Sequence, residues 1–354
     1  MALAVMNIIP IIFMFSLIIF TNLQTLALCA PQVPCFFVFG DSLVDNGNNN
    51  QLKTEAKVNY LPYVKDFPQG PTGRFTNGRN AADFIAELLG FDTFIPPFAT
   101  AQENDIIKGL NYASGSAGIR DETGEQLGDR ISLDRQLVNH NHTISRIARL
   151  LGNGTSAEEH LGKCLYYFVV GSNDYINNYY MPEYYPTSSK YTPEEYATVL
   201  IQQYSQQLRT LYNFGARKVS ISGLGPLGCI PEELARGTNG SACVDVINDA
   251  VQLFNDKLEL LVNDLNRNFT DAKFIYIDAL DLKPEELFSL VRSGISILSK
   301  PCCKVSNSTG QCVSGLPTCP VRDLHVFFDN FHPTELIHKA VGTAAYTEFL
   351  KVIL

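Results

Sequence analysis

Four bulky apolar side chains stand in a row at the first of four predicted strands, which indicates burial on both faces, and three further stretches are candidates for buried strands. Longer segments separate them, in which apolar side chains recur every three or four positions, the period of an amphipathic helix. Strands that alternate with helices predict right-handed β-α-β units and a mainly parallel sheet covered on both faces, which is an α/β fold. The predicted strands are residues 36–39, 165–170, 218–222 and 273–277.

The same pattern predicts helices over residues 80–89, 192–213 and 245–266, and from residue 333 toward residue 349. The second of these opens with Thr192-Pro-Glu-Glu, an N-cap residue followed by proline at the first helical position. Residues 62–78 are rich in proline, glycine and polar side chains and predict a long loop.

No linker or internal repeat divides the rest of the chain, so a single domain is predicted for residues 30–354. Residues 8–20 form an apolar run of about 13 residues, too short for a span of about 20, and small residues follow from Ala27 to Ala30. We therefore predict that residues 1–29 are a signal peptide. Because the first basic residue is Lys53, no basic segment precedes the apolar run, and a retained membrane anchor remains the alternative.

Charge narrows the range of partners. The 354 residues carry a formal net charge of −9, with a sequence pI near 5.2, and the basic residues are scattered. This balance argues against a nucleic-acid partner and against electrostatic attraction to an anionic membrane.

Cysteines and glycosylation sequons both indicate export. Cleavage after Cys29 leaves eight of the nine cysteines, an even number that suits disulfides, although buried free thiols would also fit. A zinc site is disfavoured because the cysteines near the carboxyl end lack paired C-x-x-C spacing. We predict a secreted protein with N-glycosylation at five Asn-x-Ser/Thr sites: Asn141, Asn153, Asn239, Asn268 and Asn307.

One serine stands where a nucleophile is expected. Ser42 follows the strand at residues 36–39, and ligand crevices of open α/β sheets form at the carboxyl ends of strands. Serine needs a base, and His332 near the other end of the chain is the candidate. Asp329 lies three residues earlier, so a turn can bring its carboxylate to the imidazole nitrogen that faces away from serine. Pro333 suits the start of a helix that follows this turn.

Two further loops offer donors for an oxyanion. Residues 111–118 are small and glycine-rich, which lets a backbone N–H approach a ligand closely. Asn173 follows the second predicted strand and can direct its side-chain amide into the same crevice. The backbone N–H of Ser42 is a third candidate donor.

These segments resemble the GDSL family of SGNH hydrolases, specifically the plant-type extracellular GDSL esterase/lipases. The similar motifs are Gly40-Asp41-Ser42-Leu43, residues 72–79, the block at Asn111, Gly171-Ser-Asn173-Asp174, residues 223–229 and Asp329-x-x-His332-Pro333. Together they cover nearly the whole mature chain.

The resemblance implies a flavodoxin-like three-layer sandwich and a secreted serine carboxylic ester hydrolase of the cell wall or apoplast. It implies no cofactor and no metal, and an acyl-ester or lipid substrate. By resemblance, Ser42 is the nucleophile, Asp329 and His332 complete the triad, and Ser42, Gly115 and Asn173 form the oxyanion hole. Family members often have Gly-Gly where this chain has Gly115-Ser116, so which of these two N–H groups donates stays open.

Other interpretations of single motifs are weaker. Residues 223–228 match the dinucleotide pattern G-x-G-x-x-G, but Pro226 and Pro231 interrupt the helix that should follow. The pair His140 and His142 lacks accompanying metal ligands and is expected on a solvated helix face. Seven tyrosines in residues 175–196 form either a substrate-receiving rim or a loop packed on its own domain.

Three functions are compatible with these motifs. The leading one is ester hydrolysis through an acyl-enzyme on Ser42. The same triad would also serve an acyltransferase, in which an alcohol replaces water. A catalytically silent extracellular binding protein is the third.

Overall fold

The computed structural model of the chain describes residues 30–237, 242–279 and 300–353. The predicted signal peptide and the sequon at Asn239 lie outside the described residues. Within them, no helix combines the length and apolarity that crossing a bilayer requires.

The centre of the fold is a parallel sheet with the strand order β1-β2-β3-β4. The four predicted strands are confirmed to within one residue. The first is buried at every position, the second and third at four of five, and the fourth is only partly buried. The strands are β1 (Phe36–Gly40), β2 (Leu165–Val169), β3 (Lys218–Ser222) and β4 (Lys273–Ile277).

A fifth extended segment, residues 108–114, extends this sheet at the free edge of β1. The N–H groups of Phe36 and Val38 donate to Lys108 and Leu110, and those of Tyr112 and Ser114 donate to Val38 and Gly40. The chain thus passes from β1 to one neighbour and then crosses to β2 on the other side, which is the flavodoxin-like order. The crevice of such a sheet lies at the carboxyl end of β1, directly before Ser42.

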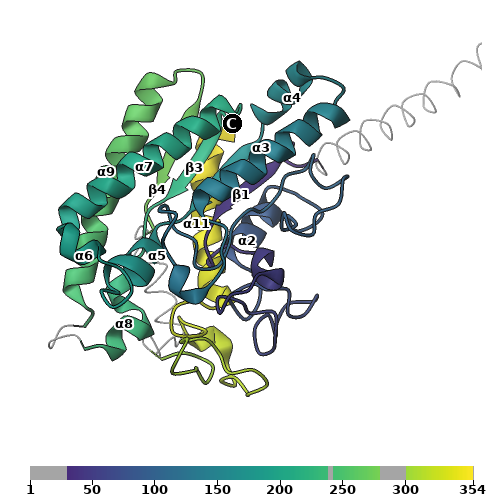
Figure 1. The fold of residues 1–354 in the computed structure, drawn as a ribbon. Helices are drawn as coiled ribbons and strands as arrows, with labels where there is room; N and C mark the ends of the chain where they lie inside the picture. Colours follow the sequence, from purple (N-terminus) through teal and green to yellow (C-terminus); the bar gives the residue numbers. More distant parts are fainter. Residues whose placement is uncertain (1–29, 238–241, 280–299, 354) are drawn as a thin grey trace, which may run out of the picture.

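Helices cover both faces of the sheet, which makes the predicted three-layer α/β sandwich (Figure 1). On one face lie α3, α7 and α9, and on the other lie α2 and α11. The α-helices are α2 (Ala81–Leu88), α3 (Leu133–Leu150), α4 (Gly154–Leu161), α5 (Ser172–Asp174), α6 (Thr187–Lys190), α7 (Pro193–Asn213), α8 (Pro231–Ala235), α9 (Asp245–Asn268) and α11 (Glu335–Ile353). Short 3-10 helices at Asn48–Gln51, Glu125–Leu127, Leu227–Cys229 and Arg322–Leu324 and a π-helix at Tyr175–Tyr179 punctuate the loops.

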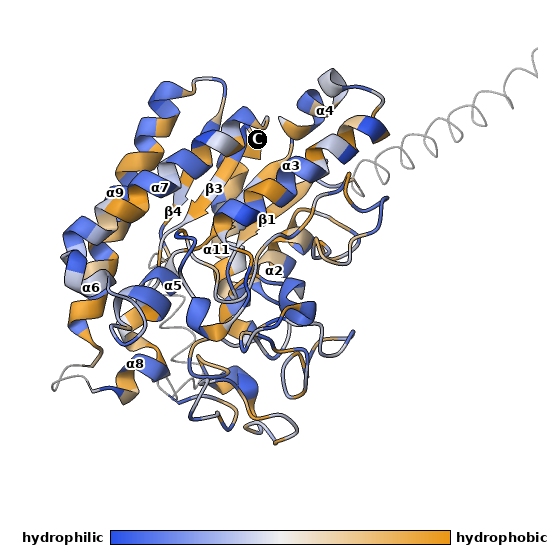
Figure 2. Ribbon diagram, in the orientation of Figure 1, coloured by the Kyte–Doolittle hydropathy of each residue, from blue (hydrophilic) through white to orange (hydrophobic). Residues whose placement is uncertain are grey.

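Side chains that alternate along the strands point to opposite faces of the sheet, so the core around the sheet has two parts. Phe37 and Phe39 of β1 pack in the larger cluster with α3, α7 and α9, whereas Phe36 and Val38 pack in a second cluster with α2 and α11. Figure 2 shows the consequence, with apolar strands inside and polar outer faces on the helices. All four side chains are fully buried, so β1 is held rigidly where it delivers Ser42.

Local sequence explains where the helices begin. Thr192 caps α7 with a reciprocal pair of bonds to Glu195, and proline occupies the first turn, as predicted. The carboxyl-terminal helix begins at Glu335, two residues later than predicted. The reason is that Pro333 forms a bridge with Phe327 and the Thr334 N–H donates to Val326 O, which keeps this segment extended.

The eight cysteines after Cys29 form four disulfides: Cys35–Cys164, Cys229–Cys243, Cys302–Cys319 and Cys303–Cys312. The prediction of disulfides is therefore confirmed. The last two close a compact loop region beside the carboxyl-terminal helix.

The expectation of a solvated His140 is wrong. Its ring is fully buried and packs edge-on against Phe37 and Phe39 of β1. Burial lowers the pKa of His140 to about 3, so it is a neutral core residue. His142, on the opposite side of α3, is exposed as expected.

Candidate active site

Ser42 lies in a turn that the end of β1 fixes. Asp41 donates its N–H to Val169 O of β2 at 3.0 Å, and its side chain accepts the N–H of Leu43 at 3.0 Å. Glycine is required at position 40, since a Cβ there would lie 2.3 Å from Val169 O. The strand edge and these two bonds determine where the Ser42 hydroxyl points.

The structure brings Ser42, His332 and Asp329 together. His332 Nε2 lies 2.8 Å from Ser42 Oγ, and His332 Nδ1 lies 2.9 Å and 2.8 Å from the two carboxylate oxygens of Asp329. The N–H groups of Phe331 and His332 also donate to Asp329 Oδ1, at 2.8 Å and 2.7 Å, so the turn expected from the three-residue spacing is present. With Nδ1–H held by the carboxylate, Nε2 is the nitrogen left to accept the serine proton.

Residues 72–79 hold the histidine loop in place. Asn77 Oδ1 accepts the N–H of Glu335 at 2.8 Å, and Arg79 Nε donates to Glu335 Oε1 at 2.6 Å, both at the start of α11. Phe75 packs on the His332 ring with a centroid separation of 4.9 Å. This motif, which the resemblance identified without a role, therefore helps to hold the imidazole and the turn that carries it.

Asn173 stands directly after β2, in α5, and faces the same cavity as Ser42 and His332. Its side chain donates one hydrogen to Ala117 O at 3.0 Å and accepts from Asn177 Nδ2 at 2.7 Å. A side-chain amide has two N–H donors, so these contacts fix its orientation and leave one donor for a ligand.

Gly115 does not fit the role of oxyanion donor. Its N–H already donates to Asp45 Oδ2 at 3.0 Å, and Gly115 is not among the residues that line the cavity. Ser116, one position on, does line it and has a left-handed φ of 63°. Among the described residues, the Ser116 N–H has no acceptor and its buried Oγ has no partner. The free backbone donor of this pair is thus that of Ser116.

Two buried aspartates connect the loops around the cavity. Asp45 accepts the N–H groups of Gly47 and Gly115, which links the serine loop to the loop at residues 111–118. Asp174 accepts the N–H groups of Ile119 and Arg120, which links the asparagine motif to the same loop. Burial raises the pKa of each carboxyl to about 6, although these N–H donors oppose the shift.

A third carboxyl, Asp41, lies at the cavity wall beside the nucleophile. Burial raises its pKa to about 7, against the opposing effects of the Leu43 N–H and the neighbouring His332. Its Oδ2 has no hydrogen-bond partner among the described residues.

The cavity itself has a volume of about 160 Å³, and both the nucleophile and the base open into it. Many of its walls are apolar: Leu43, Leu127, Ile176, Met181, Leu227, Ile230 and Phe331. Apolar walls with a few convergent polar groups are typical of small-molecule sites. The loop at residues 223–229 thus contributes a wall, Leu227, to this cavity.

The tyrosine-rich segment is a packed loop rather than a substrate rim. Tyr175, Tyr179 and Tyr196 are buried: Tyr179 stacks on Tyr196, and Tyr175 meets Tyr196 edge-on. None of the seven tyrosines lines the cavity; Ile176 and Met181 do so from the same segment.

Four of the five sequon asparagines lie in the described part of the chain, and all four are exposed: Asn141, Asn153, Asn268 and Asn307. Asn307 also lies at the wall of the cavity.

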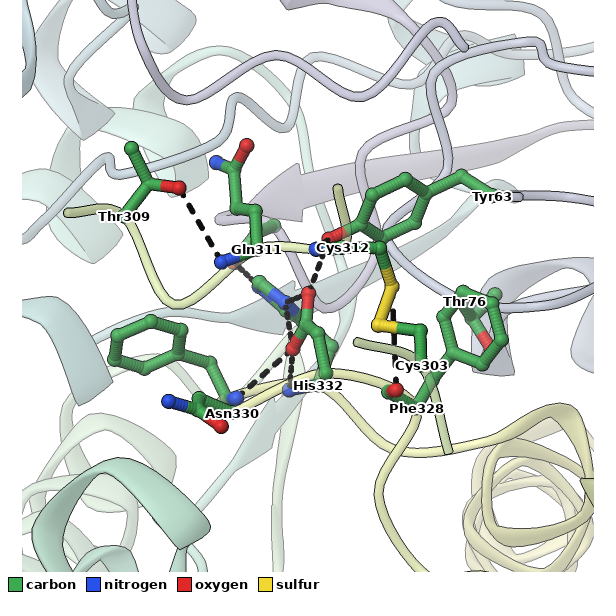
Figure 3. A network of polar contacts seen from close by, with 12 residues as sticks. Tyr63, Thr76, Cys303, Thr309, Gln311, Cys312, Phe328, Asn330 and His332 are labelled. Carbon is green, nitrogen blue, oxygen red and sulfur yellow. Dashed lines mark hydrogen bonds and ion pairs between the residues drawn. A yellow bond between two sulfur atoms is a disulfide. The ribbon is translucent and has the colours of Figure 1, made fainter. Parts of the chain in front are cut away.

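No sequence pattern indicates a role for Tyr63, yet it contacts the triad directly. Its hydroxyl lies 2.5 Å from Asp329 Oδ2, and the Cys312 N–H donates to it at 3.0 Å (Figure 3). The residue belongs to the proline- and glycine-rich loop, and a contact across 266 positions leaves no local signal in the sequence.

Comparison with known proteins agrees with this geometry. The family model described as GDSL-like Lipase/Acylhydrolase matches residues 36–345. Three Arabidopsis thaliana proteins are similar over nearly their whole length. GDSL esterase/lipase At1g29670 is 50% identical over 89% of this chain and 87% of its own. GDSL esterase/lipase At4g18970 is 46% identical over 91% and 90%, and GDSL esterase/lipase At5g45670 is 47% identical over 89% and 88%. The chain therefore belongs to the GDSL-like lipase/acylhydrolase family and is a carboxylic ester hydrolase.

Proposed function

We propose that this protein is a secreted esterase that cleaves acyl esters through a covalent acyl-enzyme on Ser42. The observation that carries the proposal is the 2.8 Å contact between Ser42 Oγ and His332 Nε2, with Asp329 on the other imidazole nitrogen. This is the arrangement in which a histidine can take the proton of a serine and be stabilised as it does so.

The reaction has two steps. His332 removes the Ser42 proton as Oγ attacks the ester carbonyl, and it then gives this proton to the departing alcohol. Water next attacks the acyl-enzyme, with His332 again acting as the base, which releases the acid and restores the serine. Asp329 holds Nδ1–H throughout and stabilises the imidazolium.

The oxyanion is held by three donors: the backbone N–H of Ser42, the backbone N–H of Ser116 and the side-chain amide of Asn173. Ser116 takes the place first expected for Gly115, whose N–H is bonded to Asp45. Donors that are fixed before the reaction need not reorganise when the negative charge develops. Their stabilisation of the transition state is therefore usually large.

The cavity is large enough to bury a small or medium acyl group, the acid half of the ester substrate. A dry cavity of about 150 Å³ accepts a molecule of the size of benzene. The volume of about 160 Å³ found here is comparable, and its walls are largely apolar. Glu232 and Arg236 are among the polar residues that line the rest of the cavity, and the net charge of −9 does not favour nucleic acid. No cofactor enters the proposed steps.

Export and glycosylation belong to the same proposal. Four disulfides and exposed sequon asparagines fit the oxidising compartments of the secretory route, where residues 1–29 would serve as the signal.

Labelling with a serine-directed phosphonate tests the proposal together with hydrolysis of p-nitrophenyl esters. The wild-type protein should be labelled stoichiometrically and lose activity in parallel. Ser42→Ala should abolish labelling and lower kcat by at least about 10³-fold. The control is Ser306→Ala, a serine in the same part of the surface whose hydroxyl contacts Ser308 and not the triad. Labelling that persists in Ser42→Ala would refute the assignment.

A further inference from the structure

Tyr63 is fully buried and contacts the carboxylate that supports the candidate base. Its hydroxyl lies 2.5 Å from Asp329 Oδ2 and 3.0 Å from the backbone nitrogen of Cys312. Figure 3 shows it between the Cys312 backbone and the turn that carries His332. No other tyrosine of the described chain contacts the triad through a hydrogen bond.

The direction of these bonds is fixed by chemistry. A backbone N–H can only donate, so the Tyr63 oxygen accepts from Cys312. The single hydroxyl proton is then directed at Asp329. Burial, followed by the adjacent Asp329 charge and hydrogen bond, raises the pKa of Tyr63 well above its ordinary value, so the hydroxyl keeps this proton.

The surroundings leave the hydroxyl little freedom. The Tyr63 ring meets Phe328 and Tyr60 edge-on, each with centroids 5.5 Å apart. Residues 303–312 form a hairpin that the Cys303–Cys312 disulfide closes, and this hairpin supplies the Cys312 N–H. The same hairpin is bonded to the histidine turn, since the Asn330 N–H donates to Gly310 O at 3.1 Å.

We propose that Tyr63 is a positioning residue that orients the Asp329 carboxylate and limits the negative charge it presents to His332. This inference rests on the proposed function of the triad. Besides the imidazole, Asp329 accepts from the Phe331 N–H, the His332 N–H and the Tyr63 hydroxyl. The first two go to Oδ1, so Tyr63 is the donor that balances Oδ2 and keeps both oxygens within reach of Nδ1.

Tyr63→Phe removes the hydroxyl alone and keeps the packed ring. The freed Oδ2 would lose its orientation, and kcat/KM should fall by about tenfold, the value of one hydrogen bond to a charged group. The carboxylate would also present more charge to the imidazole, which favours the protonated ring. The acid limb of the kcat/KM profile should therefore move to higher pH, by about half a pH unit or more.

Other titratable groups near these residues are left unchanged by the substitution. Asp41 in the serine loop and His338 in α11 both interact electrostatically with His332, and Tyr60 faces Tyr63. A difference between the wild-type and variant profiles thus reports on the Tyr63 hydroxyl. A residue with a purely structural role would lower the amount of folded protein without moving the acid limb.

Tyr60→Phe is the matched control. Its hydroxyl donates to Cys312 O at 3.0 Å, on the same hairpin, but makes no hydrogen bond to Asp329. It should destabilise the hairpin while leaving the acid limb where it is in the wild type. A Tyr63→Phe enzyme with the wild-type profile, or a Tyr60→Phe enzyme with the same displacement, overturns the inference.

Ser42→Ala separates this inference from the proposed function. Full activity in Ser42→Ala refutes the triad itself, whereas an inactive Ser42→Ala beside an unaltered Tyr63→Phe refutes only the role of Tyr63. If Tyr63→Phe does not fold, the wild-type protein decides through proton NMR with labelled tyrosine. The Tyr63 hydroxyl proton should then exchange slowly, and exchange as fast as at the exposed Tyr184 overturns the inference.

Discussion

Asp45 Oδ2 accepts the backbone N–H of Gly115 across 3.0 Å, in the interior of the protein. The contact joins two loops separated by 70 positions, and it decides which backbone donor of the loop at residues 111–118 faces the cavity. With the Gly115 N–H turned toward the carboxylate, the next N–H along the chain, that of Ser116, is the one without an acceptor in the described part of the chain.

Asp45→Asn should therefore disturb both stability and catalysis. Asp45 Oδ1 also accepts the N–H groups of Gly47 and Asn48, so an amide nitrogen at either oxygen position leaves a buried donor without a partner. We expect a loss of about 1–3 kcal/mol in the free energy of unfolding, measured with urea. We also expect a lower kcat with little change in KM, since the Ser116 donor would move. If the free energy of unfolding and kcat both keep their wild-type values, the Asp45–Gly115 contact does not determine the conformation of this loop.

Asn173→Ala should reduce kcat by about 10²- to 10³-fold, the usual effect of losing one oxyanion donor. KM should change much less, because the donor acts on charge that develops only in the transition state. Steady-state kinetics on a p-nitrophenyl ester measures both.

The matched control for Asn173 is Asn177→Ala. It removes the bond to Asn173 Oδ1 at 2.7 Å but keeps the donors of Asn173. Its effect on kcat should be clearly smaller than that of Asn173→Ala. Equal effects would mean that Asn173 acts by supporting the loop.

Arg74→Met should strongly destabilise the protein. Arg74 forms two bonds to Asp83, at 2.7 Å and 2.8 Å, and both side chains are almost completely buried. Removing one member of a buried pair leaves an uncompensated charge, which costs about 3–5 kcal/mol. Urea unfolding measures the loss.

Arg135→Met supplies the comparison, because Arg135 and Asp129 form an exposed pair at 3.0 Å. Its loss should cost no more than about 1 kcal/mol. A similar small cost for Arg74→Met would show that Asp83 is neutralised in another way. Arg74 also belongs to the motif that contacts the histidine loop, so its variant should lose activity at lower urea concentrations than the control.

Local physics made much of the fold predictable. The first two strands were apparent because each is a run of bulky apolar side chains, and α7 because its capping residues stand at the right spacing. The turn that brings Asp329 to His332 depends on three residues of local spacing, which the sequence also displays.

Contacts between distant segments could not be predicted in this way. The edge segment at residues 108–114 is short and half polar, and its pairing with β1 depends on the whole sheet. The direction of the Gly115 N–H depends on Asp45, and the role of Tyr63 depends on a residue near the other end of the chain.

His140 differs from these residues, because the sequence did contain a pattern that indicates its burial. Leu133, Leu137, Ile144 and Ile147 flank it at helical spacing, so it falls on the buried stripe of α3. The prediction was based on the H-x-H spacing of His140 and His142 and not on this apolar stripe.

This buried histidine predicts a pH dependence of stability. The pKa of His140 in the fold is about 3, below its ordinary value of 6.5. Below pH 6.5 the unfolded chain therefore binds the extra proton, so the contribution of this site is complete above pH 6.5 and is lost as the pH falls toward 3. Between pH 7.5 and pH 5 the loss amounts to about 2 kcal/mol.

His140→Phe should remove this loss, so its free energy of unfolding should decrease by about 2 kcal/mol less than that of the wild type over the same pH interval. Comparing each protein with itself at two pH values cancels the packing cost of the larger ring. His142→Asn, at the exposed neighbour, should keep the wild-type dependence. An unaltered dependence in His140→Phe would show that the buried ring is not the group responsible.

The sequon at Asn307 predicts that a glycan adjusts access to the cavity. Asn307 is exposed and lies at the cavity wall, on the hairpin that the Cys303–Cys312 disulfide closes. A glycan there would obstruct bulky esters and leave small ones unaffected. In protein produced with glycosylation, both Asn307→Gln and Thr309→Ala should raise kcat/KM several-fold for long or branched esters, but not for p-nitrophenyl acetate.

Thr309→Ser is the decisive control for this prediction, because it keeps the sequon. It also keeps a hydroxyl at the place where Thr309 Oγ1 accepts the Gln311 N–H at 3.4 Å. If the glycan is responsible, this variant should behave as the wild type, and enzymatic deglycosylation of the wild type should reproduce the effect of Thr309→Ala. If the hairpin alone is responsible, deglycosylation should change nothing while Thr309→Ala still does, because only the latter removes the hydroxyl from the turn.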